Sequence, residues 1–278
     1  ALRHIKRTIM SKTILITGAT DGIGFETAKV LRATGHSVLL HGRSAAKLDA
    51  ARAAVAAVDG DGRIATYQAD LSSIAATRHL ADEIRRAEPD LDVLINNAGV
   101  VFGGEFEQVS LEQHLNTFRI NTEGLMATSH AFIEDLIQSK EGYLVNIASA
   151  SAFVGLPYGS TYAASKWAVV GFSESLRLEM LERGLKQVKV TTVCPSYIAT
   201  GMFKGVKTPL FSPMLTPNRV ADSILNGVAK GEAFVIEPPM ARSVELLKGV
   251  LPRKLWDQVA RRTGVSTSMY SWKGKDKG

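Results

Sequence analysis

The sequence predicts an α/β fold built on a doubly wound parallel sheet of about seven strands. Short runs of β-branched and aliphatic residues alternate with longer helical patterns, and a glycine-rich turn directly follows the first run. Repeated strand–helix–strand units imply a parallel sheet with right-handed crossovers. The 278 residues suffice for one large domain with a substantial core.

The same alternation predicts the elements in chain order. Strands are expected where β-branched and aliphatic residues run together, at 13–17, 37–40, 63–68, 92–95, 143–148, 188–194 and 234–236. Helices are expected between them, at 25–34, 45–57, 73–87, within 110–138, and at 157–183. A last crossover helix should begin after Thr216, an N-cap followed by Pro217, and end near Gly231.

The net charge of +6 lies in the two ends of the chain. Basic residues within the first twelve positions contribute four charges and residues 273–277 contribute a net two, so residues 13–272 sum to zero. A nucleic-acid enzyme would be expected to carry a basic face on its folded body, so we predict no nucleic-acid partner. Basic tails suit a solubilising end or weak attraction to an anionic membrane surface.

The chain has one cysteine, Cys194, so no intrachain disulfide can form and a reducing context is expected. We expect a cytoplasmic protein that could also associate with a membrane. Cys194 follows the apolar run 188–193 and is expected to be a buried structural thiol. No apolar run reaches the ~18 to 20 residues needed to span a bilayer. The histidines lack metal-ligand spacing, so no metal site is expected, at His36, His79, His114 or His130.

The turn at 17–24 has the sequence TGATDGIG, between the first strand and the first helix. Gly18 permits a tight exit from the strand. Gly22 and Gly24 would let the backbone approach a pyrophosphate at the helix N-terminus, where free amides and the helix dipole favour anions. In this position the pattern strongly indicates a dinucleotide site.

The end of the second strand, His41-Gly42-Arg43-Ser44, lacks the acidic residue that would bind the adenosine ribose and repel a 2′-phosphate. Arg43 can instead pair with that phosphate through charge-assisted hydrogen bonds. We therefore predict NADP(H), with NAD(H) as the alternative. Two observations keep the alternative open: Arg43 could simply be a surface residue at the turn, and Asp21 places a negative charge nearby.

Ligands of a doubly wound sheet lie beyond the carboxyl ends of its strands. One conspicuous residue follows each of the first six strands: Gly18, Arg43, Asp70, Asn96, Ser149 and Pro195. Asp70-Leu71 could flank an adenine ring, and 96–99 could line the cofactor and brace the fourth strand.

Tyr162 and Lys166 are four residues apart, on one face of a predicted helix. A tyrosine hydroxyl normally has a pKa near ~10, and a cation held beside it stabilises the phenolate and lowers that pKa. The pair could therefore act as a general acid and base on an alcohol or a carbonyl. Without the neighbouring motifs, the same spacing could be a solvated helix face.

Together these motifs resemble the short-chain dehydrogenase/reductase family, of the compact single-domain type with a Rossmann-type sheet, over roughly residues 12–236. The resemblance is carried by TGATDGIG (17–24), DL (70–71), NNAG (96–99), INTEG with Asn121, the Ser149 region and YAASK (162–166). It implies that Tyr162 is the acid/base, that Lys166 lowers its pKa and binds the nicotinamide ribose, that Ser149 orients the substrate oxygen, and that Asn121 holds a water in the proton relay.

The resemblance also implies that Ile198 and Thr200 contact the nicotinamide carboxamide and a nearby phosphate. The chain departs from the family's frequent Pro-Gly after the sixth strand, with Ser196 after Pro195. The expected catalytic residues are Asn121, Ser149, Tyr162 and Lys166. The expected cofactor-binding residues are Gly18, Thr20, Asp21, Gly22, Ile23, Gly24, Arg43, Ser44, Asp70, Leu71, Asn97, Ala98, Gly99, Tyr162, Lys166, Pro195, Ile198 and Thr200.

Residues 243–278 are expected to be a helical extension of a catalytic domain at 12–242, after a basic tail at 1–11. The closing segment 268–274 is similar to the branch of the family that contains retinol and 17-beta-hydroxysteroid dehydrogenases. The loop after the sixth strand is rich in large apolar residues that suit an apolar substrate, or that could pack into a core or an oligomer interface: Met202, Phe203, Leu210, Phe211, Met214 and Leu215.

The extension carries an apolar helical face interrupted at Pro252 and formed by Val244, Leu247, Leu251, Leu255 and Val259. It could lie in a membrane interface, or it could close the domain or a dimer. We predict an NADP(H)-dependent oxidoreductase that interconverts a lipophilic alcohol and its ketone or aldehyde, as a homodimer or homotetramer. The alternatives are a 3-oxoacyl-thioester reductase and an NADP-binding redox-sensing scaffold.

Overall fold

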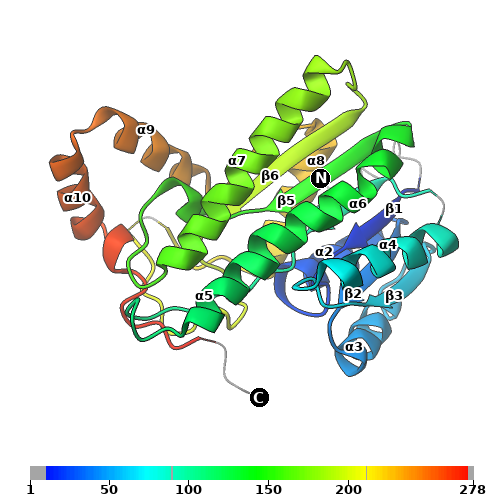
Figure 1. The fold of residues 1–278 in the computed structure, drawn as a ribbon, viewed down its shortest axis with the longest axis horizontal. Helices are drawn as coiled ribbons and strands as arrows, with labels where there is room; N and C mark the ends of the chain where they lie inside the picture. The colour runs from blue at the N-terminus through cyan, green and yellow to red at the C-terminus, as the bar shows by residue number, and fades with distance from the viewer. Residues whose placement is uncertain (1–10, 89, 211, 275–278) are drawn as a thin grey trace.

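The computed structural model describes residues 11–88, 90–210 and 212–274, and these contain a seven-stranded parallel sheet (Figure 1). The strands lie side by side in the order β3 (Ile64–Gln68), β2 (Ser37–Gly42), β1 (Thr13–Ile16), β4 (Val93–Asn96), β5 (Gly142–Ile147), β6 (Val188–Pro195) and β7 (Phe234–Glu237). The order reverses between β1 and β4, where a doubly wound sheet opens a crevice for ligands. The predicted fold class is confirmed.

Two layers of helices cover the sheet. One face packs against α2 (Gly22–Ala33), α3 (Ala45–Ala56) and α8 (Pro217–Lys230), and the other against α4 (Ile74–Ala87), α6 (Leu125–Gln138) and α7 (Ser160–Glu182). In β1, Ile14 and Ile16 belong to the first core and Leu15 to the second. Because both faces are buried, the strands are continuous apolar runs.

Three predicted helix boundaries are corrected by the structure. The first helix begins at Gly22 instead of residue 25, because Asp21 accepts a 2.7 Å hydrogen bond from the Gly22 amide and caps it. The region 110–138 divides into α5 (Leu111–Phe118), a π-helical turn (Arg119–Gly124) and α6. The predicted helix 157–183 begins at Ser160, because Tyr158 has a left-handed backbone with φ 61°.

The C-terminal helices α9 (Arg242–Val250) and α10 (Arg253–Arg262) form a hairpin that projects from one end of the molecule (Figure 1). The short turns η3 (Pro239–Ala241) and η4 (Val265–Thr267) flank it, and Pro252 separates the two helices. The Lys248 ammonium donates a 2.9 Å hydrogen bond to the carbonyl of Phe153, at the end of η2 (Ala150–Phe153), and lies 4.1 Å from the Trp167 ring centroid. These contacts fix the hairpin to the body of the protein.

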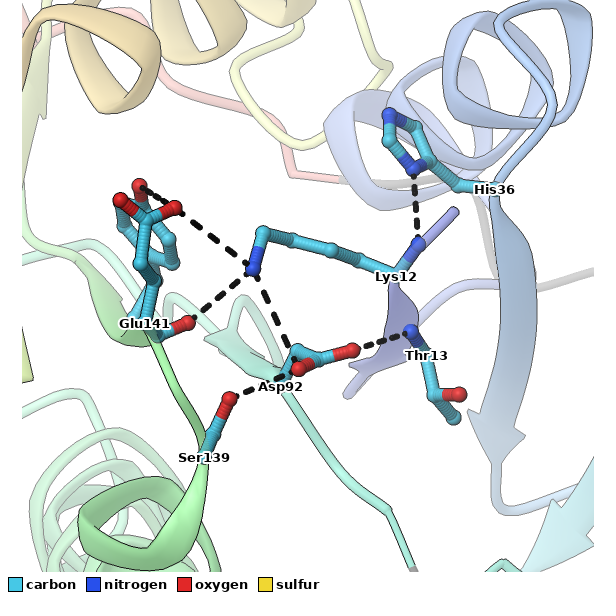
Figure 2. A network of polar contacts seen from close by, with 7 residues as sticks. Lys12, Thr13, His36, Asp92, Ser139 and Glu141 are labelled. Carbon is cyan, nitrogen blue, oxygen red and sulfur yellow. Dashed lines mark hydrogen bonds and ion pairs between the residues drawn. The ribbon is translucent and has the colours of Figure 1, made fainter. Parts of the chain in front are cut away.

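A polar network joins the amino ends of the central strands (Figure 2). The Asp92 carboxylate accepts hydrogen bonds from the Thr13 amide at 2.9 Å and the Ser139 hydroxyl at 2.7 Å, and lies 3.9 Å from the Lys12 ammonium. The Lys12 amide donates to Nδ1 of His36 at 3.2 Å. This network ties the starts of β1 and β4 at the edge opposite the candidate site.

Candidate active site

The carboxyl ends of the strands surround a cavity of about 720 Å³, here called the first cavity. Of the predicted cofactor residues, Gly24 is missing from its wall. The wall contains all the others: Gly18, Thr20, Asp21, Gly22, Ile23, Arg43, Ser44, Asp70, Leu71, Asn97, Ala98, Gly99, Tyr162, Lys166, Pro195, Ile198 and Thr200. The topology therefore brings together residues that are spread over most of the chain.

The glycine turn has a backbone that side chains would obstruct. Gly18 and Gly22 both have left-handed backbones, with φ 64° and 59°. A Cβ on Gly18 would lie 2.9 Å from the Ala98 Cα, and one on Gly22 would lie 3.1 Å from the Thr200 methyl. The turn therefore leaves the N-terminus of α2 beside the first cavity, which is a geometry that suits a phosphate group.

Gly24 lies at a point of close packing. It is buried, and a Cβ there would overlap the Asn97 side-chain amide and lie 2.8 Å from the Gly18 carbonyl oxygen. The missing side chain lets α2 pack closely on the turn. Asn97 donates to the Thr17 and Gly18 carbonyls at 3.0 Å each, so Gly24 makes room for the brace of the turn.

His41 is a site residue that the sequence reasoning missed. It is buried at the end of β2, where its Nδ1 accepts from the Gly18 amide at 3.3 Å and its Nε2 lies 3.2 Å from the Ala69 carbonyl. Burial lowers its pKa from 6.5 to about 4, so the ring is neutral at physiological pH. Neutral His41 therefore supports the glycine turn through its hydrogen bond with the Gly18 amide. The sequence did not indicate this role, because a histidine within a strand has no pattern that predicts it.

Two basic residues beside strand β2 and helix α3 line the first cavity. Arg43 lies at the end of β2, as predicted, and Lys47 on the first turn of α3 was not anticipated. The Arg43 carbonyl accepts a 3.0 Å hydrogen bond from Gln68, which holds the turn. The pKa of the Asp70 carboxyl is lowered, first by a backbone hydrogen bond from Ser72 and further by Arg43.

Asn96 braces the sheet below the site. Its amide donates to the Ser129 hydroxyl and the Asn146 side-chain oxygen, both at 2.9 Å, and its oxygen accepts from Thr128 at 2.6 Å. Asn96 therefore ties β4, β5 and α6 together, while its neighbours Asn97, Ala98 and Gly99 line the cavity.

A second cavity, of about 320 Å³, lies beside the first. Ser149 lines it, and Tyr162, Ser196 and Phe203 line both cavities. The Phe203 ring packs edge-on against Tyr162, with centroids 5.9 Å apart. The phenol of Tyr162 therefore stands where the two cavities meet.

Tyr162 and Lys166 share a helix face as predicted, but the pKa of the phenol shifts the other way. Burial raises the pKa of Tyr162 to about 12, and a hydrogen bond with Ser149 offsets only part of that rise. The Lys166 ammonium lies 5.9 Å from the Tyr162 ring centroid and donates a 2.8 Å hydrogen bond to the Ile147 carbonyl. Desolvation therefore sets the direction of both shifts, since burial also lowers the pKa of Lys166 to about 8.

Asn121 is buried within the π-helical turn and lines neither cavity. Its side-chain oxygen accepts from the Val100 amide at 2.8 Å, and its amide donates to the Val100 carbonyl at 2.9 Å and to the Ser165 hydroxyl at 3.0 Å. Both amide donor directions are thus used by protein groups. The side chain therefore positions the loop after β4.

The second cavity has an apolar outer wall from the two predicted segments. The loop after β6 supplies Phe203, Pro209 and Leu210, and the hairpin supplies Val244, Leu247, Trp256 and Val259. Of the predicted hairpin face, Val244, Leu247 and Val259 line this cavity, whereas Leu255 is exposed and does not line it. In the loop, Leu215 is buried in the main core, Met214 is exposed, and Phe211 lies outside the described residues.

Ser196, the departure from the family pattern, has a defined position. Its amide donates to the Glu237 carbonyl at 2.7 Å, and its hydroxyl lies 2.7 Å from the Ser212 hydroxyl. Cys194 is buried, as expected of a structural thiol, and burial raises its pKa to about 12. Within the described ranges, no three His, Cys, Asp or Glu side chains gather in a way that could hold a metal ion.

Comparison with known proteins gives the same family as the motifs. The short chain dehydrogenase family matches residues 12–210. The chain is 30% identical to Short-chain dehydrogenase/reductase family 16C member 6 of Bos taurus, over 98% of this chain and 86% of that protein. It is 30% identical to Epidermal retinol dehydrogenase 2 and 26% identical to Estradiol 17-beta-dehydrogenase 11, both of Homo sapiens, over 95% and 94% of this chain and 86% of each of those proteins.

Solved structures share the architecture. A short-chain dehydrogenase from Sphingobium yanoikuyae in complex with NADPH has a TM-score of 0.73 and 27% identity, covering 96% of this chain and 98% of that one. A short chain dehydrogenase/reductase from Burkholderia phymatum in complex with NAD has a TM-score of 0.77 over 86% of this chain and 93% of that one; at 23% identity, this likeness concerns the fold. From the family match, the relatives and the shared sheet together, we conclude that the chain belongs to the short-chain dehydrogenase/reductase family of oxidoreductases, which act on alcohol and carbonyl groups.

Proposed function

We propose that this protein is an NADP(H)-dependent oxidoreductase that interconverts a lipophilic alcohol and its ketone or aldehyde. The observation that carries the proposal is the position of Tyr162, on the shared wall of the first and second cavities. A group that must exchange a proton with a substrate beside a nucleotide belongs at such a junction.

The first cavity fits a dinucleotide. A Cβ on Gly18 would lie 2.9 Å from the Ala98 Cα, so the glycine turn has no room for a side chain there. A Cβ on Gly99 would lie 3.3 Å from the Asn121 Oδ1 and 3.7 Å from the Lys166 Nζ, so this wall of the cavity is also crowded. When bound, the nicotinamide supplies or accepts the hydride. Gly22 and the start of α2 would hold the pyrophosphate, and Lys166 would bind the nicotinamide ribose, as in the family.

The protein's own part of the reaction is proton transfer and charge stabilisation. With a pKa raised to about 12, Tyr162 keeps its proton at neutral pH and can give it to a developing alkoxide, which is the far stronger base. Ser149, which hydrogen-bonds to Tyr162, would hold the same oxygen as charge develops. The protonated phenol is the form that carbonyl reduction requires.

Tyr162→Phe tests this role. The variant keeps the ring that packs on Phe203 and removes the proton donor. Oxidation of NADPH in the presence of a panel of ketones, aldehydes and a 3-oxoacyl thioester should fall ~10²- to 10⁴-fold, with cofactor binding retained. Activity above about a tenth of wild type would exclude an essential proton donor. The panel also separates a carbonyl reductase from a thioester reductase, and no turnover at all would favour a binding scaffold.

We base the cofactor preference on Arg43 and Lys47, which both line the first cavity. We expect Arg43→Ala to weaken NADPH binding by roughly 1.5 to 3 kcal/mol, because a charge-assisted hydrogen bond to the 2′-phosphate is lost. NADH binding should hardly change. Arg52, exposed on α3 and absent from the cavity wall, provides the matched control Arg52→Ala. Equal weakening of both nucleotides by Arg43→Ala would rule out the 2′-phosphate contact.

A further inference from the structure

The α9–α10 hairpin carries an outward apolar surface that no other described element covers. It consists of Met240, Leu246, Leu247, Val250 and Leu255, here called the hairpin surface. Leu246 is 68% exposed and Val250 is 72% exposed, among the highest values for large apolar residues in the described parts of the chain. Large apolar side chains grouped at the tip of a projecting element indicate an interaction site.

Exposed basic residues accompany the hairpin surface on the same two helices. Residues 242–262 contain six Lys and Arg and two Asp and Glu. Among the basic residues, Arg242, Arg253, Lys254, Arg261 and Arg262 are exposed. This combination of exposed leucines with a basic border is complementary to anionic lipid headgroups over an acyl layer.

The hairpin surface is continuous with the second cavity. Met240 and Leu247 are exposed and also line that cavity, while Val244 and Val259 line it from the inner side of the hairpin. The cavity therefore reaches the surface of the protein between the exposed apolar side chains. An apolar molecule could pass from a lipid layer into the cavity along a path of apolar contacts.

We propose that the hairpin surface docks on an anionic lipid surface, with Leu246 and Val250 entering the acyl region and the basic residues contacting the headgroups. The docked hairpin places the entrance of the second cavity against the lipid. Only this last consequence, delivery of substrate, rests on the proposed function. In the described part of the chain, no helix is both long and apolar enough to cross a bilayer.

Vesicle flotation tests the docking with the full chain and no substrate or cofactor. The probes are phosphatidylcholine vesicles with and without phosphatidylserine. We expect binding to the anionic vesicles that salt weakens. The double variant Leu246→Glu/Val250→Glu should lose at least about tenfold in binding, since two apolar insertions are replaced by two repelled charges. Arg253→Glu/Lys254→Glu should lose at least about 25-fold, because each cation near an anionic surface contributes about fivefold.

Ile74, exposed on α4 at the other side of the molecule, provides the matched control Ile74→Glu, which should bind vesicles like the wild type. Thermal melting verifies that each variant is folded. The proposal is overturned if wild type does not bind anionic vesicles, or if the hairpin variants bind as tightly as the control. A shift in oligomer size with the hairpin variants, without any vesicle binding, would assign the surface to self-association instead. Since binding is measured without turnover, failure of the proposed enzyme activity would leave this result intact.

Discussion

Protonation of His41 should destabilise the protein as the pH falls below neutrality. The neutral ring accepts from the Gly18 amide through Nδ1 and can donate to the Ala69 carbonyl through Nε2. Burial lowers its pKa from 6.5 to about 4. Between these values the unfolded chain binds the proton and the folded chain does not. The stability is therefore complete above pH 6.5 and is lost as the pH falls towards about 4.

The size of this effect follows from the two pKa values. The difference between 6.5 and about 4 corresponds to about 3 kcal/mol at about 1.36 kcal/mol per pKa unit. At about pH 4.5 most of that loss, roughly 2 to 3 kcal/mol, should already be present. Such a loss is a large part of the stability of an ordinary domain, so it should be visible in denaturant unfolding.

His41→Gln isolates this contribution, because an amide can accept and donate but does not titrate in this range. Urea unfolding of both proteins at about pH 7.5 and about pH 4.5 gives two differences in the free energy of unfolding. Carboxylates and His36, whose pKa is also lowered by burial, are common to both proteins and cancel. The wild type should lose roughly 2 to 3 kcal/mol more than the variant. The same loss in both would refute the assignment, as would a His41 titration near 6.5 by NMR.

Two further predictions concern packing and substrate size. Gly24→Ala should destabilise the protein by about 1 to 3 kcal/mol, because its methyl would overlap Asn97. Gly171→Ala, in α7 with nothing within 4 Å of the new methyl, should be neutral or stabilise by up to ~1 kcal/mol; equal effects in thermal melts would contradict the packing argument. Val244→Trp should narrow the second cavity and lower kcat/KM for a long-chain ketone at least about tenfold more than for a short one; a parallel loss on both would separate Val244 from the substrate site.

Motifs tied to a strand end could be placed from the sequence. Gly18, Arg43, Asp70 and Pro195 each follow a buried apolar run, and the parallel topology brings the ends of such runs to one edge of the sheet. Alternation alone is enough for that inference, because it fixes which end of each strand leads to the next helix. The observed strands begin and end within one residue of the predicted bounds, except that the second strand ends two residues later, at Gly42. The carboxyl edge of the sheet was therefore predicted correctly.

Properties that depend on packing could not be read from local pattern. The helical spacing of Tyr162 and Lys166 can be read from the sequence, but the shifts of their pKa values follow from burial in the folded protein. His41 and Lys47 reach the first cavity only through the register of β2 and the start of α3. Likewise, Leu255 fits the predicted helical face, yet it is exposed and does not line the second cavity.

The end of the chain determines how the loop after β6 sits over both cavities. Within that loop, the Met202 carbonyl accepts from the Trp272 indole at 3.0 Å, and the Lys204 carbonyl accepts from the Lys273 amide at 2.9 Å. The Tyr197 hydroxyl, just before the loop, lies 2.6 Å from the Ser268 hydroxyl. Because Met202 lines the first cavity and Tyr197 the second, the C-terminal segment restrains the walls of both. The residues after α10 therefore help to fix the position of this loop, and Val265 and Ser268 among them line the second cavity directly.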